Sequence, residues 1–177
     1  MKNKIETNRI TLRPFNQTDL SDFYEYASVP GVGEMAGWPH HKSIEISQKV
    51  LDSFMENNEV YAIWHKVDKK VIGSLGLHKR GWLTKDERYK HLNSVELGYV
   101  LSKAYWGQGI MVEAASAAIN AAFESGIEII ACNHFLDNNQ SRRVIEKLGF
   151  AYDSNGIFKS TLLEKDFEEK RYVLWKS

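Results

Sequence analysis

Apolar and polar positions in the first half of the chain alternate mostly at the two-residue period of strands, with two helical stretches between them. Residues 5–14 alternate loosely and stop at Pro14, which predicts a strand. The segment 28–41 holds two prolines and three glycines, which indicates a loop longer than a plain connector. The elements predicted here are one strand, two helices and three further strands, at residues 5–14, 18–27, 43–55, 59–67, 71–78 and 95–101.

The second half of the chain alternates helices and strands. Residues 109–125 carry six alanines and an apolar residue every three or four positions, which predicts a helix that Gly126 ends. Residues 127–133 form a continuous apolar run, typical of a strand buried on both faces. A further helix and a closing pair of strands follow, at residues 138–148, 150–158 and 168–175.

The order of these elements is β-α-α-β-β-β-α-β-α-β-β. We therefore predict an α/β (α+β) fold with one mixed sheet and helices on both of its faces. The charged and aromatic stretch 81–92 is interpreted as an extended hairpin arm. The sequence shows no internal repeat or linker, so residues 1–177 are expected to form a single domain.

Composition narrows the class of function. With 43% hydrophobic residues, the chain has enough apolar surface for a real core. Lys and Arg number 23, as do Asp and Glu, so no net field favours nucleic acid or a membrane surface as a partner. The chain has a single cysteine, no apolar leader and no apolar run of ~18 residues, and we expect a cytoplasmic protein without disulfides.

The segment 96–115 carries the chemistry. It reads as a strand, a turn with Gly107 and Gly109, and an alanine-rich helix, so free N–H groups at the helix start could bind a phosphate. Any turn between a strand and a helix can use glycine, however, and the glycine pair alone leaves both readings open. A dinucleotide fingerprint is excluded because Val112 stands where a third glycine is required, and a Walker loop because no G-K-[ST] ending follows.

Two motifs in this half resemble those of a known family. W-G-Q-G-I-M-x-E-A at 106–114, followed by D-N-N-Q-S-R-R-V-I-E-K-L-G-F at 137–150, is similar to the Gcn5-related N-acetyltransferases (GNAT). The opening E-T-N-R-I-T-L-R-P-F at 6–15 and the L-G-Y-V-L strand match the Rim-type branch, which includes ribosomal-protein alanine N-acetyltransferases. The resemblance spans nearly the whole chain and implies a mostly antiparallel GNAT sheet.

The resemblance also implies acetyl-CoA as co-substrate. Its pantetheine arm would bond main-chain groups near Val100 and Leu101, the Leu101 N–H would polarise the thioester carbonyl, and Asn138 would contact the same arm. Main-chain N–H groups of the turn would hold the pyrophosphate, at Trp106, Gly107, Gln108, Gly109, Ile110, Met111 and Val112. Trp106 and Met111 depart from the family pattern in their side chains, which leaves the main-chain anion site intact.

Acetyl transfer to an amine with a pKa near ~10 needs a base. Glu96 is the candidate because it shares a strand face with Gly98, which leaves room for a substrate; the alternative is a solvated strand glutamate. The family's tyrosine acid falls on Ile145 here. Ser141 is the substitute we favour as general acid, and the alternatives are a plain helix residue or no side-chain acid.

The loop 28–41 lies where the family forms its acceptor site. We take Glu34, Trp38 and His40 as acceptor-site candidates, against the alternative of loop packing. No third ligand accompanies the adjacent His40 and His41, so no metal is expected. Cys132 lies in an apolar run and is interpreted as a buried, inert thiol.

Three further residues have two readings each. His78 is a second base or a structural histidine, and Arg142 and Arg143 meet a CoA phosphate or lie on a solvated helix face.

The main hypothesis is an N-acetyltransferase that acts by direct transfer from acetyl-CoA in a ternary complex, as a monomer or homodimer. The alternative is a non-catalytic CoA-binding sensor or interaction module. A protein N-terminus, a polyamine, an amino sugar and other small amines all remain open as acceptor.

Overall fold

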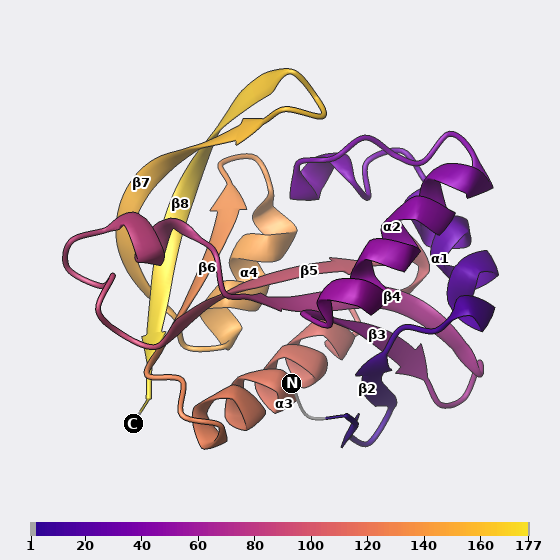
Figure 1. Cartoon of the computed structure of the whole chain (residues 1–177), viewed down its shortest axis with the longest axis horizontal. Coiled ribbons are helices and arrows are strands. Elements are labelled where there is room, and N and C mark those ends of the chain that lie inside the picture. The colour runs from indigo at the N-terminus through magenta and orange to yellow at the C-terminus, as the bar shows by residue number, and fades with distance from the viewer. Residues whose placement is uncertain (1–2, 177) are drawn as a thin grey trace.

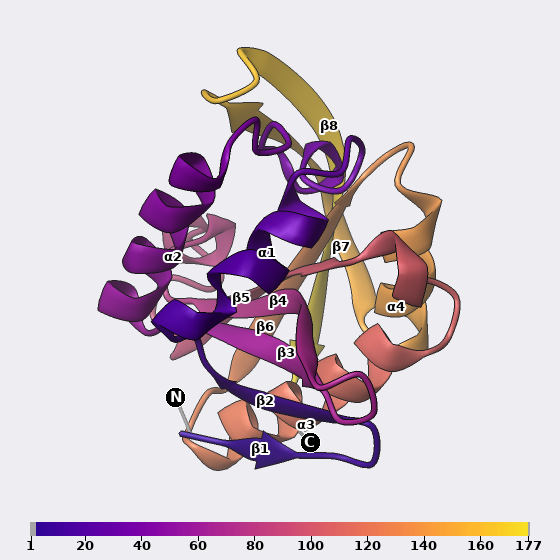
Figure 2. The same ribbon diagram turned by 90° about the vertical axis from the view of Figure 1, so that its right-hand side faces the viewer.

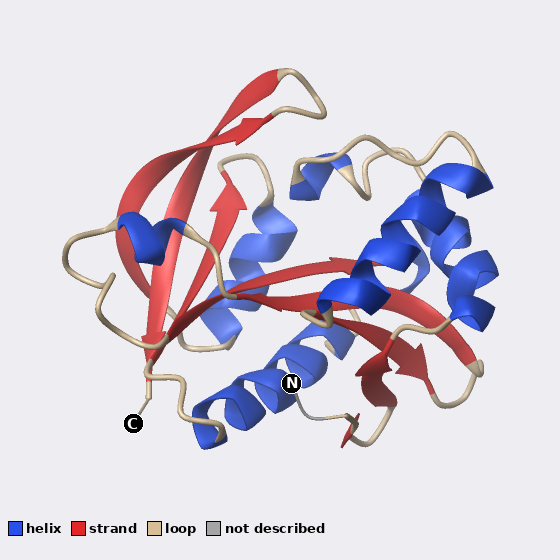
Figure 3. Ribbon diagram, viewed as in Figure 1, coloured by secondary structure: helices blue, strands red, loops and turns tan. Residues whose placement is uncertain are grey.

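A computed structural model describes residues 3–176 and places eight strands in one sheet with four α-helices around it (Figures 1 and 3). The strands are β1 (Ile5–Glu6), β2 (Ile10–Pro14), β3 (Val60–His65), β4 (Lys70–His78), β5 (Ser94–Leu101), β6 (Ile129–Phe135), β7 (Ala151–Ser160) and β8 (Lys165–Trp175). The helices are α1 (Leu20–Ala27), α2 (Ile44–Asn57), α3 (Ile110–Glu124) and α4 (Asn139–Lys147). Among these residues, no helix is long and apolar enough to cross a membrane.

The sheet is mixed and mostly antiparallel, as predicted. Its order is β1-β2-β3-β4-β5-β6-β8-β7, and β5 and β6 form the parallel pair among antiparallel neighbours. Figures 1 and 2 show α1 and α2 on one face of the sheet and α3 on the other. Each face has its own core, since Leu51 of α2 packs with α1 and Ala115 of α3 packs with β4 and β5.

β5 and β6 separate at the centre of the sheet. Their pairing runs from Ser94 with Ile129 to Leu97 with Cys132. Beyond this point β5 continues to Leu101 and β6 to Phe135 without a shared register. The separation opens a gap between two adjacent strands, in the middle of a sheet whose other strands stay paired.

Two sequence predictions were wrong in detail. The strand expected over 5–14 is a short hairpin, because Thr7 turns back through a bond from its N–H to the carbonyl of Ile10 (3.0 Å). The hairpin arm expected over 81–92 is a 3-10 turn at Trp82–Lys85 followed by further turns. Its Leu83 is buried against β6 and β8, so apolar contact with the sheet face shapes this segment.

Candidate active site

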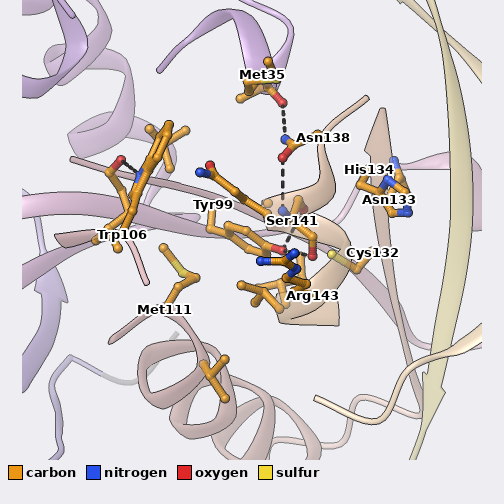
Figure 4. A pocket seen from close by; sticks show the side chains of 18 of the residues that line it. Met35, Tyr99, Trp106, Met111, Cys132, Asn133, His134, Asn138, Ser141 and Arg143 are labelled. Atoms are coloured by element: carbon orange, nitrogen blue, oxygen red, sulfur yellow. Dashed lines mark hydrogen bonds between the residues drawn. The ribbon is translucent and has the colours of Figure 1, made fainter. Parts of the chain in front are cut away.

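The gap between β5 and β6 opens into a cavity of ≈ 440 Å³ (Figure 4). Its walls are the second half of β5, the turn that leads into α3, the end of β6, the first turns of α4 and the loop before α2. Of the residues singled out from the sequence, most line this cavity: Glu96, Val100, Leu101, Trp106, Gly107, Gly109, Ile110, Met111, Val112, Asn138 and Ser141.

The turn at one end of the cavity has the backbone of an anion site. Gly107 and Gly109 both adopt φ +74°, a left-handed conformation that favours glycine, and Gly109 precedes the first turn of α3. The N–H groups at that helix start have no intrahelical partner, and the helix dipole is positive there. Ala114, Ala115 and Ala118 are fully buried, so α3 lies close on the sheet and fixes the turn. A pyrophosphate fits this donor set.

Arg9 holds this turn from outside, a contact that the sequence reading missed. Its Nη1 donates to the carbonyl of Gln108 (2.8 Å) and its Nε to Glu113 in the first turn of α3 (2.6 Å). Glu113 also accepts from Thr7 Oγ1 (2.6 Å) and from the Arg9 N–H (2.8 Å). The short hairpin β1–β2 is thereby tied to the turn, and the only acidic side chain in this part of α3 is already neutralised.

Trp106 and Gln108 use their side chains to shape the turn. Trp106 Nε1 donates to the carbonyl of Leu101 (2.7 Å), and Gln108 Nε2 donates to the carbonyl of Ala104 (2.9 Å). Gln108 is exposed and does not line the cavity. The tryptophan that departs from the family pattern therefore anchors the end of β5.

The main chain of Leu101 faces the gap. The Ser102 N–H donates to the carbonyl of Ile72 (2.8 Å), so these two residues form a hydrogen-bonded pair of the β4–β5 ladder. Leu101 and Gly73 are the next pair along this ladder. In an antiparallel ladder hydrogen-bonded and non-hydrogen-bonded pairs alternate, so the N–H and C=O groups of Leu101 point away from β4. The Leu101 N–H thus points toward the side from which β6 has diverged.

Asn138, Ser141 and Tyr99 form a polar cluster at the start of α4 (Figure 4). Asn138 caps the helix, since its Oδ1 accepts from the Ser141 N–H (3.0 Å), while its Nδ2 donates to the carbonyl of Met35 (3.2 Å). Ser141 Oγ lies 2.8 Å from the hydroxyl of Tyr99. Burial, reinforced by neighbouring Cys132, raises the pKa of Tyr99, so this hydroxyl stays protonated.

Tyr99 lines the cavity and is a site residue that the sequence analysis missed. Its position on the apolar face of β5 indicated a core side chain, and its ring does pack there. Its hydroxyl nevertheless reaches Ser141. The sequence did hold a signal for a tyrosine from elsewhere, because the position of the family tyrosine on α4 is taken by Ile145, which is fully buried. A tyrosine from the neighbouring strand brings a hydroxyl to this part of the cavity.

Glu96 lies at the other end, on the face of β5 that the alternation predicted. Its Oε2 accepts from the Trp82 N–H and its Oε1 from Asn133 Nδ2, both at 3.3 Å. Burial raises the pKa of Glu96, and the nearby carboxylate of Glu169 adds to this effect. A raised pKa brings a carboxylate closer to the range in which it exchanges protons at neutral pH.

The loop residues proposed for the acceptor have partners within their own loop. Glu34 accepts from the N–H groups of Gly31 (2.7 Å) and His40 (3.0 Å) and from His40 Nδ1 (2.7 Å). Burial raises the pKa of Glu34, but these bonds outweigh it and bring the value to about 2. Trp38 packs into the α1–α2 core, and the cavity is lined by neighbouring Met35 instead. The acceptor role of Glu34, Trp38 and His40 stays a prediction.

Of the remaining candidates, Cys132 and Arg143 line the cavity, whereas Arg142 and His78 do not. Cys132 is 1% exposed, and burial raises the pKa of its thiol, so it is protonated at neutral pH. Arg143 lines the cavity, whereas Arg142 lies on the helix surface, 3.4 Å from Glu146. His78 is the cross-strand neighbour of Glu96 on β4. Within residues 3–176, no cluster of three His, Cys, Asp or Glu side chains could hold a metal ion.

Known proteins share both the sequence pattern and the fold. The chain matches the family described as an acetyltransferase (GNAT) domain over residues 9–151. The uncharacterized N-acetyltransferase YoaA of Bacillus subtilis (strain 168) is 26% identical over 152 residues, covering 82% of this chain and 81% of that protein. A GNAT-family acetyltransferase from Bacillus anthracis superposes with a TM-score of 0.81 at 22% identity, covering 97% of this chain and 98% of that one.

Two further solved structures have names that bear on the chemistry. The ribosomal-protein-S5-alanine acetyltransferase from Vibrio fischeri has a TM-score of 0.72 at 19% identity, with 98% and 99% of the two chains covered. The microcin C7 self-immunity acetyltransferase MccE, solved with acetyl-CoA and AMP, has a TM-score of 0.74 at 17% identity, with 96% and 94% covered. Because the family match spans most of its length, this chain belongs to the GNAT acetyltransferases and is an acetyl-CoA-dependent N-acetyltransferase.

Proposed function

We propose that the chain transfers acetyl directly from acetyl-CoA to a primary amine while both substrates are bound. The observation that carries this proposal is the placement of Glu96 and the glycine turn in one cavity, at opposite ends of the stretch of β5 that lines it. One end offers main-chain donors for a pyrophosphate and the other a half-buried carboxylate for an amine. A single cavity with these two ends suits a ternary complex.

The co-substrate would be held by main-chain groups. The N–H groups of residues 107–112 bind the pyrophosphate, and main-chain groups near Val100 and Leu101, among them the gap-facing N–H of Leu101, bind the pantetheine arm. Acetyl-CoA supplies an activated acetyl group and a thiolate leaving group. The Leu101 N–H donates to the carbonyl oxygen as negative charge develops there, which stabilises the transition state. Arg143, at the cavity wall, offers a positive charge to a phosphate.

Glu96 acts as the base that removes a proton from the acceptor, directly or through a water molecule. Its raised pKa supports this role, because a weakly basic carboxylate could not hold the proton that it takes. The hydroxyl pair of Ser141 and Tyr99 lines the same cavity. Ser141 stabilises the leaving thiolate by donating a hydrogen bond to it, and the Tyr99 hydroxyl, which its raised pKa keeps protonated, donates in turn to Ser141 Oγ.

The acceptor is an amine carried by a peptide N-terminus or a small molecule. The loop 28–41 borders the cavity through Val32, Met35 and Ala36 and is our candidate acceptor wall, with Glu34, Trp38 and His40 shaping it from behind. The V. fischeri neighbour is named for a ribosomal-protein alanine, which makes alanine-initiated peptides the first acceptors to try.

The test is release of CoA thiol from acetyl-CoA over a panel of peptides, polyamines and aminoglycosides. We expect thiol release with at least one amine, and loss of most of that activity in Glu96→Gln. Acetyl-CoA binding in calorimetry, with no thiol released for any amine, would instead support a non-catalytic CoA-binding module and overturn the proposal.

A further inference from the structure

We propose that Asn133 is the positioning residue of Glu96, and that it joins this base to a second carboxylate, Glu169, through one side-chain amide. The inference rests on the proposed function, since it assigns a support to the residue named there as base. Asn133 lies at the cavity wall near the end of β6, one residue after the last paired position with β5 (Figure 4). The sequence reading did not single it out.

The amide bridges the two carboxylates directly. Asn133 Nδ2 lies 3.3 Å from Glu96 Oε1 and 3.2 Å from Glu169 Oε2. An asparagine amide carries two N–H donors, one for each carboxylate. Both acceptors are therefore satisfied by a single group that neither adds nor removes charge.

Trp82 fixes which way the amide faces. Its Nε1 donates to Asn133 Oδ1 (3.1 Å), and an indole N–H can only donate. The oxygen of the amide must therefore point at Trp82 and the nitrogen at the carboxylates. The main-chain N–H of Trp82 also donates to Glu96 Oε2 (3.3 Å), so one residue of the 81–92 segment holds both the base and its support.

Glu169 is a firm anchor for this bridge. It is 3% exposed, and its other oxygen accepts from Arg171 Nε (2.8 Å). The guanidinium of Arg171 lies 5.3 Å from the centre of the Trp82 ring, a cation–π contact that closes the network. Gly156 on β7 leaves the space that Arg171 occupies, because a Cβ there would collide with the guanidinium.

The network sets the proton affinity of Glu96 by two opposed effects. The charge of Glu169 raises the pKa of Glu96, whereas the bond from Asn133 lowers it. Other titratable or charged groups around this site are Arg171 on β8, Cys132 on β6 and His78 on β4, which itself lies 3.5 Å from Glu59. Since Asn133 is neutral, its removal and the removal of Glu169 should shift the pKa of Glu96 in opposite directions.

Two variants test this opposition, with the full-length enzyme and an acceptor found in the amine panel. Asn133→Ala should lower kcat by roughly 10- to 100-fold, the equivalent of one lost bond to a charged group, with little change in the KM for acetyl-CoA. The acid limb of its kcat/KM profile should move to higher pH. In Glu169→Gln the acid limb should move to lower pH. The acceptor is the same in every assay, so differences between variants report the enzyme.

A second readout needs no turnover. The carboxyl carbon of Glu96, assigned by comparison with Glu96→Gln, can be titrated by NMR in the free protein, where the same opposite shifts are expected. Glu168→Gln is the matched control, because it is the same substitution one residue away, on an exposed side chain of β8. Its profile and its titration should equal those of the wild-type protein.

Unchanged pH limbs and an unchanged Glu96 titration in Asn133→Ala and Glu169→Gln would overturn the inference, as would shifts in the same direction. If Asn133→Ala does not fold, judged by circular dichroism, the Glu169→Gln shift alone decides. Full activity in Glu96→Gln would remove the base and with it this inference. Loss of activity in Glu96→Gln together with wild-type profiles in the two network variants would refute the inference and leave the proposed function standing.

Discussion

Thr7, Arg9 and Glu113 form a clamp on the turn that contains Gly107 and Gly109, and this clamp gives a prediction whose size follows from the structure. Glu113→Ala removes a carboxylate that accepts from Thr7 Oγ1, the Arg9 N–H and Arg9 Nε at 2.6, 2.8 and 2.6 Å. The hairpin β1–β2 would lose its bond to α3, and Arg9 would lose the partner that orients it toward the carbonyl of Gln108. We expect both stability and acetyl-CoA affinity to fall.

The magnitude combines three contributions. Two bonds to uncharged donors contribute about 1 kcal/mol each. The ion pair with Arg9, whose side chain is 38% exposed, adds about 0.5 kcal/mol once solvent screening is allowed for. A loss of about 2–3 kcal/mol corresponds to a fall in Tm of roughly 4–12 °C for a chain of this size.

The assay is thermal unfolding followed by circular dichroism, with acetyl-CoA affinity from calorimetry. Glu146→Ala is the control, since it removes an exposed glutamate 3.4 Å from Arg142 on α4 and should change Tm by about 2 °C at most. Burial raises the pKa of Glu113, but the bonds from Thr7 and Arg9 outweigh it, so the net shift is downward. The contribution of the ionised group is therefore complete at neutral pH.

The same linkage fixes the pH dependence. The difference in stability between the wild-type protein and Glu113→Ala should shrink as the pH falls from the ordinary glutamate value through the lowered native pKa. A Tm within about 1 °C of wild type at pH 7, together with unchanged acetyl-CoA affinity, would refute the clamp. So would a difference that grows on acidification.

Three further substitutions test other parts of the account. Gly109→Ala forces an L side chain into φ +74°, so we expect a loss of about 1–2 kcal/mol and weaker acetyl-CoA binding; unchanged unfolding would speak against it. Asn138→Ala removes the cap of α4 and the bond to Met35, at a cost of about 0.5–2 kcal/mol in urea unfolding, and an unchanged midpoint would count against this role. Glu96→Gln should unfold at a higher temperature than wild type at pH 8. The raised native pKa of Glu96 means that the wild-type protein loses stability as the pH rises above the ordinary glutamate value and Glu96 ionises. Equal Tm values at pH 8 would contradict the shift.

The sequence predicted the fold well because periodicity reports burial. The alanine helix, the apolar strand before α4 and the face of Glu96 on β5 are all set by local alternation, and the structure has each of them. The prediction failed at 81–92 because the aromatic residues there contact β6 and β8, which come later in the chain. Local pattern cannot show such a long-range contact.

The sequence predicted the part of the site that is formed by main-chain conformation. Glycines at 107 and 109 indicate a backbone conformation, which sequence can report. The side-chain partners were missed because they come from distant segments: Arg9 reaches Glu113, and Tyr99 reaches Ser141. Asn133 escaped notice for the same reason, since its partner Glu169 lies three elements later, on β8.

The central claim is direct transfer, with Glu96 as the base and without an acetylated enzyme. Intact-mass spectrometry of enzyme and acceptor during a single turnover tests it. We expect the acetyl group to move from acetyl-CoA to the acceptor with the enzyme mass unchanged throughout, and the transfer to slow sharply in Glu96→Gln. An acetylated enzyme that forms and decays at the rate of turnover, mapped to Cys132, or transfer at the wild-type rate in Glu96→Gln, would contradict it.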